Sequence, residues 1–255
     1  MSRAFHATLG LLVLSSTAIA AGHVYNKNFS ILTPSQTSDE EAQAFAEKLL
    51  QQAEKYRKTL ASDWLGEELP VGAGRTIINV AFSNKDSALT WPIDNRRRKC
   101  HMLYLSTSPE RALGSALKHE MVHVIMATRF GQGCGLPIWL EEGIASRYDD
   151  QSRISKRRAI ANWYAQTEQW PNITDVLGRQ KISTRDTSAY AIAASVTNFL
   201  LSRADRRTLV IFGAEAAATN LEAALRKHYQ IRSTHELQIA WQNWVQRNAR
   251  LAARK

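Results

Sequence analysis

The 255-residue sequence predicts an α+β fold, in which a mixed α+β half is followed by a mainly helical half. Residues 75–82 and 100–106 are rich in β-branched and aromatic residues, a composition typical of strands. The second half contains apolar residues at helical spacing, and a capping box at Ser233 opens its last amphipathic run. We therefore expect one compact unit with two lobes, 39–150 and 151–255.

The first residues have the layout of a secretory signal peptide. Arg3 precedes an apolar run over residues 9–19, and small residues favour cleavage after Ala20. The run is too short and too rich in small residues for a membrane span. We expect residues 1–20 to be removed during export to the periplasm or the medium. Residues 21–38 are polar and unpatterned, which predicts a flexible mature N-terminus.

The chain is strongly basic, with 33 Lys and Arg residues against 23 Asp and Glu residues and a net charge of +10. In an exported protein this balance favours association with anionic cell-envelope surfaces or acidic substrates. Nucleic acid is not expected as a partner, because the chain has no recognisable motif for it. The basic runs 96–99 and 156–158 are interpreted as solvated faces, and the oligomeric state is left open.

Cys100 and Cys134 are the only cysteines of the sequence. An oxidising compartment would permit them to pair. Their positions are compatible both with a disulfide and with two buried free thiols.

Three helices are expected in the first lobe. Residues 40–60 have helical periodicity. A second helix is expected to begin after Ser108, a suitable N-cap, and to continue without a breaker over 112–129 until Gly131. Pro137 then opens a third, short helix.

His119-Glu120-Met121-Val122-His123 lies inside the second of these helices. Residues i and i+4 project from the same helix face, so both imidazoles can direct a ring nitrogen at one ion. Glu120 leaves the helix on a neighbouring line, where a general base for hydrolysis is required. The alternative is a pair of ordinary core histidines, which are costly to bury without a metal or a complete hydrogen-bond network.

The third helix carries two adjacent glutamates at a specific distance in sequence from the histidine pair. Eighteen residues separate His123 from Glu142, and the helix reads Trp-Leu-Glu-Glu-Gly-Ile-Ala over 139–145. This combination resembles the gluzincins, the metallopeptidase clan of thermolysin, over residues of about 75–150. The resemblance implies one zinc ion per chain, held by His119, His123 and Glu142, and it selects Glu142 over Glu141. Two His and one Glu leave a fourth tetrahedral position open, as in catalytic zinc sites.

The resemblance also implies a thermolysin-like small mixed sheet whose edge strand binds extended substrate. Leu103, Tyr104 and Leu105 stand at the place of that strand. The family has an acidic residue one turn after its glutamate ligand, where this sequence has Ser146. Asp149, a further turn along, is the expected substitute that orients a histidine.

Tyr190 is the candidate donor to the oxyanion, because small gluzincin-like domains carry a tyrosine at a similar place. Its alternative is a core tyrosine whose hydroxyl is satisfied locally. Together these features predict an exported zinc peptidase with Glu120 as general base. Two alternatives stay open: an inactive binding or scaffolding domain of the same fold, and a zinc amidohydrolase acting on a non-peptide amide of the cell envelope.

Overall fold

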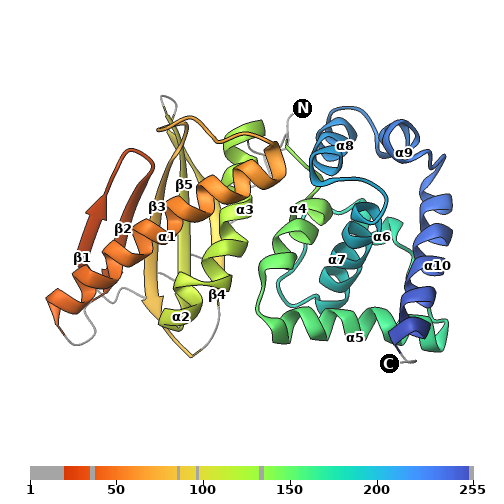
Figure 1. Cartoon of the computed structure of the whole chain (residues 1–255), viewed down its shortest axis with the longest axis horizontal. Helices are drawn as coiled ribbons and strands as arrows, with labels where there is room; N and C mark the ends of the chain where they lie inside the picture. Colours follow the sequence, from red (N-terminus) through yellow and green to blue (C-terminus); the bar gives the residue numbers. More distant parts are fainter. Residues whose placement is uncertain (1–19, 35–37, 85–86, 96–97, 132–134, 253–255) are drawn as a thin grey trace, which may run out of the picture.

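A computed structural model of the chain describes residues 20–34, 38–84, 87–95, 98–131 and 135–252. It has the predicted α+β architecture, with a sheet lobe and a helical lobe side by side (Figure 1). One hydrophobic core of buried residues extends through both lobes. The two lobes therefore form one folded unit.

The sheet has five strands in the order β1-β2-β3-β5-β4. The central pairs β2-β3 and β3-β5 are parallel, whereas β1-β2 and β4-β5 are antiparallel, so the sheet is mixed. The strands are β1 (Ala20–Tyr25), β2 (Phe29–Pro34), β3 (Arg75–Phe82), β4 (Ser87–Asn95) and β5 (Arg98–Thr107).

The prediction of a flexible segment over 21–38 is wrong for most of its length, because β1 and β2 lie there. Phe29 and Ile31 alternate with more exposed neighbours and are fully buried, which fixes β2 against the parallel strand β3. The expected signal peptide lies almost wholly outside the described residues. Ala20, after which cleavage is expected, is the first residue of β1.

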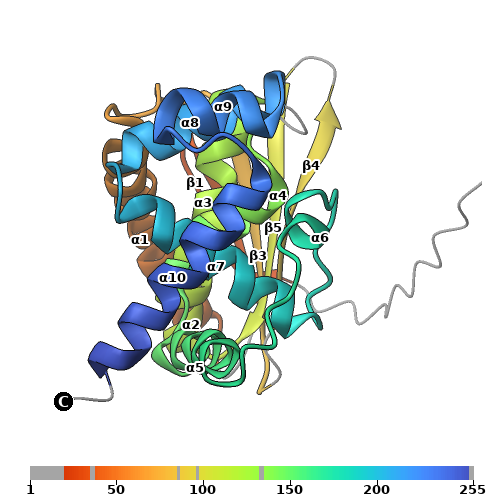
Figure 2. The ribbon, with the colours of Figure 1, turned by 90° about the vertical axis from the view of Figure 1, so that its right-hand side faces the viewer.

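Two long helices lie against one face of the sheet (Figures 1 and 2). Helix α1 (Asp39–Leu65) begins at Ser38, whose side chain accepts a hydrogen bond from the backbone N–H of Glu41. It packs on β1 and β2, while α3 (Ser115–Phe130) packs on β4 and β5. Helix α3 carries the two histidines, so the sheet supports the helix of this histidine pair from one side.

The helix expected after Ser108 is divided in two by Gly114. Ser108 caps α2 (Pro109–Leu113) as predicted, and its hydroxyl accepts from the N–H of Arg111. Gly114 then takes φ −114° and ψ −116°, outside the helical region, and α3 begins one residue later. Gly131 ends α3 with φ 83°, a conformation that favours glycine.

The helical lobe is built around α7, which packs against α4, α5, α6, α8 and α10. Although α4 precedes residue 150, it belongs in space to this lobe (Figure 1). The lobe comprises α4 (Ile138–Ala145), the 3-10 turn η1 (Ser146–Tyr148), α5 (Gln151–Thr167), α6 (Thr174–Leu177), α7 (Thr187–Leu201), α8 (Arg206–Ala218), α9 (Leu221–Tyr229) and α10 (Thr234–Ala252). Among the described helices, none is both long and apolar enough to cross a membrane.

Candidate metal centre

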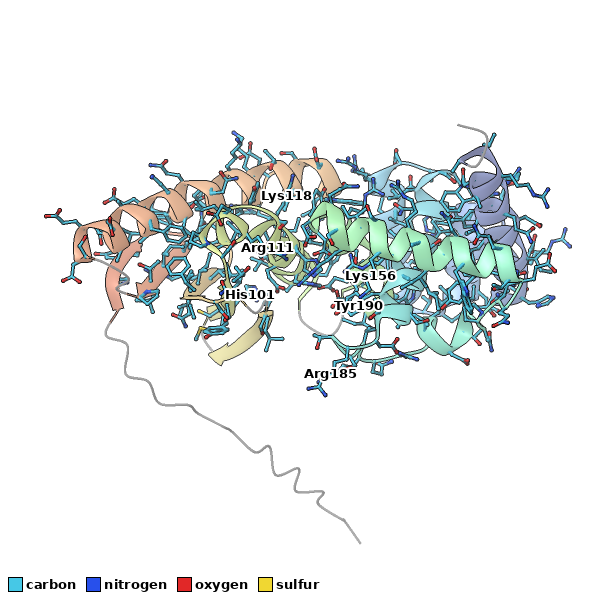
Figure 3. All side chains as sticks on the ribbon, turned by 90° about the horizontal axis from the view of Figure 1, so that it is seen from below. His101, Arg111, Lys118, Lys156, Arg185 and Tyr190 are labelled. Atoms are coloured by element: carbon cyan, nitrogen blue, oxygen red, sulfur yellow. The ribbon has the colours of Figure 1, made fainter. Side chains whose placement is uncertain are left out.

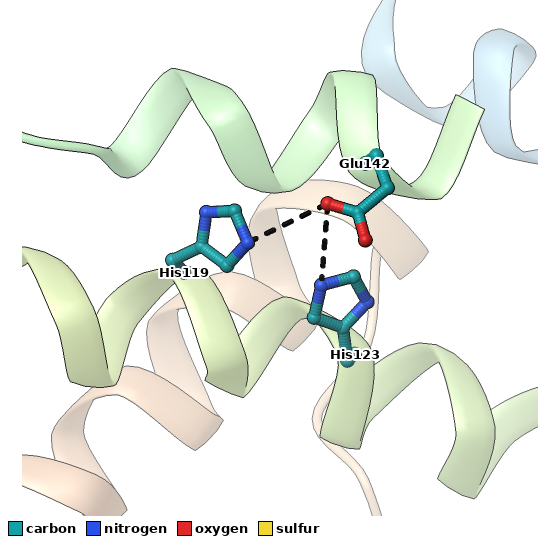
Figure 4. Close-up of side chains that lie close together, drawn as sticks. All are labelled: His119, His123 and Glu142. Atoms are coloured by element: carbon teal, nitrogen blue, oxygen red, sulfur yellow. Dashed lines mark ion pairs between the residues drawn. The ribbon is translucent and has the colours of Figure 1, made fainter. Parts of the chain in front are cut away.

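The predicted ligands converge where the two lobes meet. His119 and His123 lie one turn apart on α3, with ring centroids 5.3 Å apart, and Glu142 reaches them from α4 (Figure 4). The Oε2 atom of Glu142 lies 3.6 Å from His119 Nε2 and 3.9 Å from His123 Nε2. One ligand atom from each residue lies within 4.8 Å of the others, so the sheet lobe supplies two ligands and the helical lobe the third.

Gly143 explains why Glu142 can occupy this position. A Cβ atom at residue 143 would lie 2.0 Å from Thr197 Oγ1 and 2.8 Å from the carbonyl oxygen of Ala193, both on α7. Only glycine therefore allows α4 to pack this closely on α7. The glycine that follows the glutamate in the sequence thus places that glutamate at the histidine pair.

The three side chains fit a zinc ion. A tetrahedral zinc with bonds of about 2.0–2.1 Å separates neighbouring ligand atoms by about 3.3 Å, slightly less than the distances seen here. Glu142 Oε2 is buried, and no described residue donates a hydrogen bond to it. Such an atom is costly to bury without a cation or a donor, and the two imidazole nitrogens facing it would supply two further ligands to a cation.

A carboxylate oxygen lies next to the other ring nitrogen of each histidine. Asp149 Oδ1 lies 3.0 Å from His119 Nδ1, and His123 Nδ1 donates to Glu141 Oε1 at 2.7 Å. Both contacts leave Nε2 directed at Glu142, which is the role of carboxylates behind metal-ligating histidines. Asp149 therefore lies where a carboxylate that orients His119 would have to lie.

Ser146 and Glu141 differ from the sequence-based expectation. Ser146 stands at the family's acidic position, but its buried hydroxyl has no hydrogen-bond partner among the described residues, and so it makes no hydrogen bond to either histidine. The resemblance selects Glu142 over Glu141 as the ligand, yet Glu141 accepts a hydrogen bond from His123 Nδ1. Its adjacency to Glu142 was the available signal, because neighbouring helix positions can reach two sides of the same imidazole.

The carboxylates raise the proton affinity of both histidines. Burial lowers the pKa of His119, but contacts with Asp149 and Glu142 outweigh it and raise this pKa to about 10. In the same way Glu142 and Glu141 raise the pKa of His123 to about 9 against the effect of burial. Burial raises the pKa of Glu142, but the two positively charged histidines together have the larger effect and lower this pKa overall. The carboxylate is therefore ionised at neutral pH. The site therefore attracts positive charge, as protons or as a divalent cation.

Glu120 lies beside the ligands and is only 5% exposed. Its Oε2 accepts a hydrogen bond of 2.5 Å from Thr90 Oγ1, a residue of β4. Both side chains line a cavity of about 1430 Å³ that also contains the three ligands. Glu120 is thus oriented toward the cavity beside the ion position without being one of the converging ligands.

The prediction that residues 103–105 lie on an edge strand is wrong, because the sheet order places them on an inner strand. Leu103, Tyr104 and Leu105 lie on β5, which is paired with β3 on one side and with β4 on the other. The backbone of β5 is therefore not free, and Leu103 and Leu105 are fully buried. The edge next to the site is β4, whose residues 87–90 line the cavity. This strand was not predicted, and Pro92 within it is tolerated because edge strands can lack a donor.

Tyr190 lines the same cavity from the first turn of α7. Burial and then the negative charge of Glu142 raise the pKa of its phenol, so the hydroxyl is a neutral donor over the physiological range. The guanidinium of Arg157 lies 5.4 Å from the centre of the Tyr190 ring and also pairs with Asp149. The sequence predicts a solvated face for Arg157, but in the structure Arg157 contacts both the Tyr190 ring and Asp149.

Whether Cys100 and Cys134 form a disulfide or two free thiols is not tested by the structure. Cys100 lies on β5 and is partly buried, whereas Cys134 lies outside the described residues. The basic run 96–99 likewise has no described side chains.

Comparison with known proteins adds no assignment, since no protein-family profile matches the chain and no curated protein is similar to it in sequence.

Proposed function

We propose that the chain is an exported zinc-dependent peptidase of the gluzincin type. The observation that carries the proposal is the convergence of His119, His123 and Glu142, with Glu120 beside them in one cavity. Two imidazoles and one carboxylate are the donor set of catalytic zinc sites that keep an open position. When bound, a zinc ion would supply a Lewis acid that polarises the peptide carbonyl and lowers the pKa of water toward about 7.

Glu120 is the general base of the proposed reaction. Its carboxylate accepts the proton of the attacking water and then delivers this proton to the leaving nitrogen of the peptide bond. The hydrogen bond from Thr90 fixes one carboxylate oxygen, which supports a single working orientation of the side chain.

In the proposed reaction, Tyr190 and β4 contact the substrate. The phenol of Tyr190 donates to the oxygen of the attacked carbonyl as negative charge develops on it. The free edge of β4 pairs with the backbone of an extended peptide, as added strands do in other peptide-binding proteins. Leu89 on this strand is 55% exposed, which supports contact with a bound chain.

Glu120→Gln tests the proposal, because the amide keeps the size and the Thr90 contact but cannot accept the proton. The zinc-loaded mature protein is expected to cleave a broad peptide library, a chelator to abolish cleavage, and the variant to keep zinc and lose cleavage. Unchanged cleavage by a zinc-loaded variant would refute the role of Glu120. Absence of chelator-sensitive cleavage would refute the peptidase, in favour of a wall amidase if cell-wall fragments are hydrolysed and of a binding domain if they are not.

A further inference from the structure

Basic side chains line the cavity, most of them from the helical lobe. They come from α2, from α5 and from the segment between α6 and α7, and they are Arg111, Arg153, Lys156, Arg157, Arg179 and Lys181. The acidic residues that line the cavity are Glu120, Glu141, Glu142 and Asp149, each of which belongs to the metal centre described above. Away from the ion position, the cavity wall is therefore positively charged.

Several of these cations are already neutralised. Arg157 pairs with Asp149, and Arg179 Nη1 lies 2.6 Å from Asp186 Oδ2. Arg111 Nη2 lies 3.0 Å from Asp150 Oδ2. Because each of these guanidinium groups is paired with a carboxylate, they contribute little net positive charge to the cavity wall.

Lys156 and Lys181 are different. Both are exposed residues that line the cavity, and neither forms an ion pair with any residue in the described part of the chain. Lys156 comes from α5, next to the Arg157 that contacts Tyr190, whereas Lys181 comes from the segment that leads into α7. In the view from below, Lys156 and Tyr190 are seen where the helical lobe meets the sheet lobe (Figure 3). Two lysines without an ion pair among the described residues thus line one cavity from different elements.

The opposite side of the cavity has another character. It is formed by Ser87, Ala88, Leu89 and Thr90 of the edge strand β4, which carry no charge. An extended polypeptide paired with β4 would present side chains to the lysines across the cavity. The two walls together suit a ligand with a peptide backbone and acidic side chains.

We propose that Lys156 and Lys181 select acidic polypeptide segments, with Asp or Glu near the cleaved bond, as the substrates of this chain. The inference rests on the proposed peptidase function and names its substrate class. A polypeptide is favoured over an anionic membrane because the lysines line a concave cavity of about 1430 Å³, which an extended chain can enter and a bilayer surface cannot. The net charge of +10 adds a long-range attraction for such substrates.

Binding tests the inference without turnover. The zinc-loaded Glu120→Gln protein is titrated with three short labelled peptides that differ only in having Glu, Gln or Lys at the variable positions. The acidic peptide is expected to bind most tightly and the basic one most weakly, and added salt should reduce the difference. Cleavage of the same three peptides by the wild-type protein is measured in parallel.

A pair of double variants locates the effect. Lys156→Gln with Lys181→Gln is expected to weaken binding of the acidic peptide by roughly two- to fivefold per lysine, with the Gln peptide little changed. Lys48→Gln with Lys55→Gln removes the same charge from exposed positions of α1 outside the cavity and should leave the preference intact. Anionic and neutral phospholipid vesicles are included as competing ligands.

Each outcome is informative. Equal binding of the three peptides, or equal loss in both double variants, would overturn the inference while leaving the peptidase proposal untouched. If the cavity variant loses binding to anionic vesicles but not to the acidic peptide, the lysines serve a membrane and the inference is also overturned. Charge-selective binding without any chelator-sensitive cleavage would instead keep the binding preference and reject the peptidase.

Discussion

Replacing Asp149 with Asn should weaken zinc binding because this carboxylate holds His119. Asp149 Oδ1 lies 3.0 Å from His119 Nδ1, and its side chain is only 3% exposed. Burial raises the pKa of Asp149, but His119 and Arg157 lower it from 3.8 to about 2. One pKa unit corresponds to about 1.4 kcal/mol, so the net interaction of the ionised carboxylate with its surroundings is roughly 2–3 kcal/mol.

Arg157 accounts for part of this free energy, so the share that orients His119 is roughly 1–2 kcal/mol. Asp149→Asn is therefore expected to reduce zinc affinity by about 5- to 30-fold, measured by competition with a chelator of known affinity. Asp150→Asn is the matched control. Asp150 is the neighbouring residue, caps α5 and pairs with Arg111, but it does not contact a histidine. Equal zinc affinity of the two variants would show that Asp149 does not support the metal site.

Three further changes test other parts of the site. Zinc affinity should rise from pH 6 to about pH 9, because the ion must displace protons from His119 and His123, whose pKa values are about 10 and about 9. The metal-free protein should lose stability over the same range, since raised folded-state pKa values contribute stability below the unfolded value of about 6.5 that is lost as pH rises through 9 and 10. A zinc affinity that falls with pH in chelator competition, or a metal-free stability that rises with pH in urea unfolding, would contradict the assignment. Gly143→Ala should destabilise the protein by roughly 1–3 kcal/mol in urea unfolding and weaken zinc binding. Adding Thr197→Ala should recover part of this stability, because the Thr197 hydroxyl is the atom nearest to the new methyl group. A fully stable Gly143→Ala variant would refute the close packing of α4 on α7. Tyr190→Phe should keep zinc and fold but lower kcat/KM by about 100- to 1000-fold, and full activity would leave Tyr190 a core residue only.

The convergence of the three candidate metal ligands was predictable because its signal is local. The i and i+4 spacing of His119 and His123 on one helix needs no knowledge of the rest of the fold. Glu142 followed from its spacing and its sequence context, and the structure adds the physical reason for the glycine after it. Ser108 and Gly131 likewise marked helix ends through their own backbone and side-chain chemistry.

The surroundings of the ligands were less predictable because they depend on tertiary placement. Arg157 belongs to a basic run that resembles a solvated surface, and only the path of α5 past η1 brings it to Asp149 and Tyr190. The edge position of β4 is a property of the whole sheet, so the substrate role was assigned to β5 instead. Strand β2 was missed because its alternation of buried and more exposed residues spans only Phe29–Pro34.

The central claim is that His119, His123 and Glu142 hold one zinc ion between the two lobes. Its most direct test is the metal content and zinc affinity of the purified protein, compared with those of Glu142→Gln, which removes the negative charge and keeps the shape. We expect about one tightly bound zinc per wild-type chain and a large loss of affinity in the variant. A folded wild-type protein that binds no zinc, or that binds it equally well without the Glu142 carboxylate, would contradict the account.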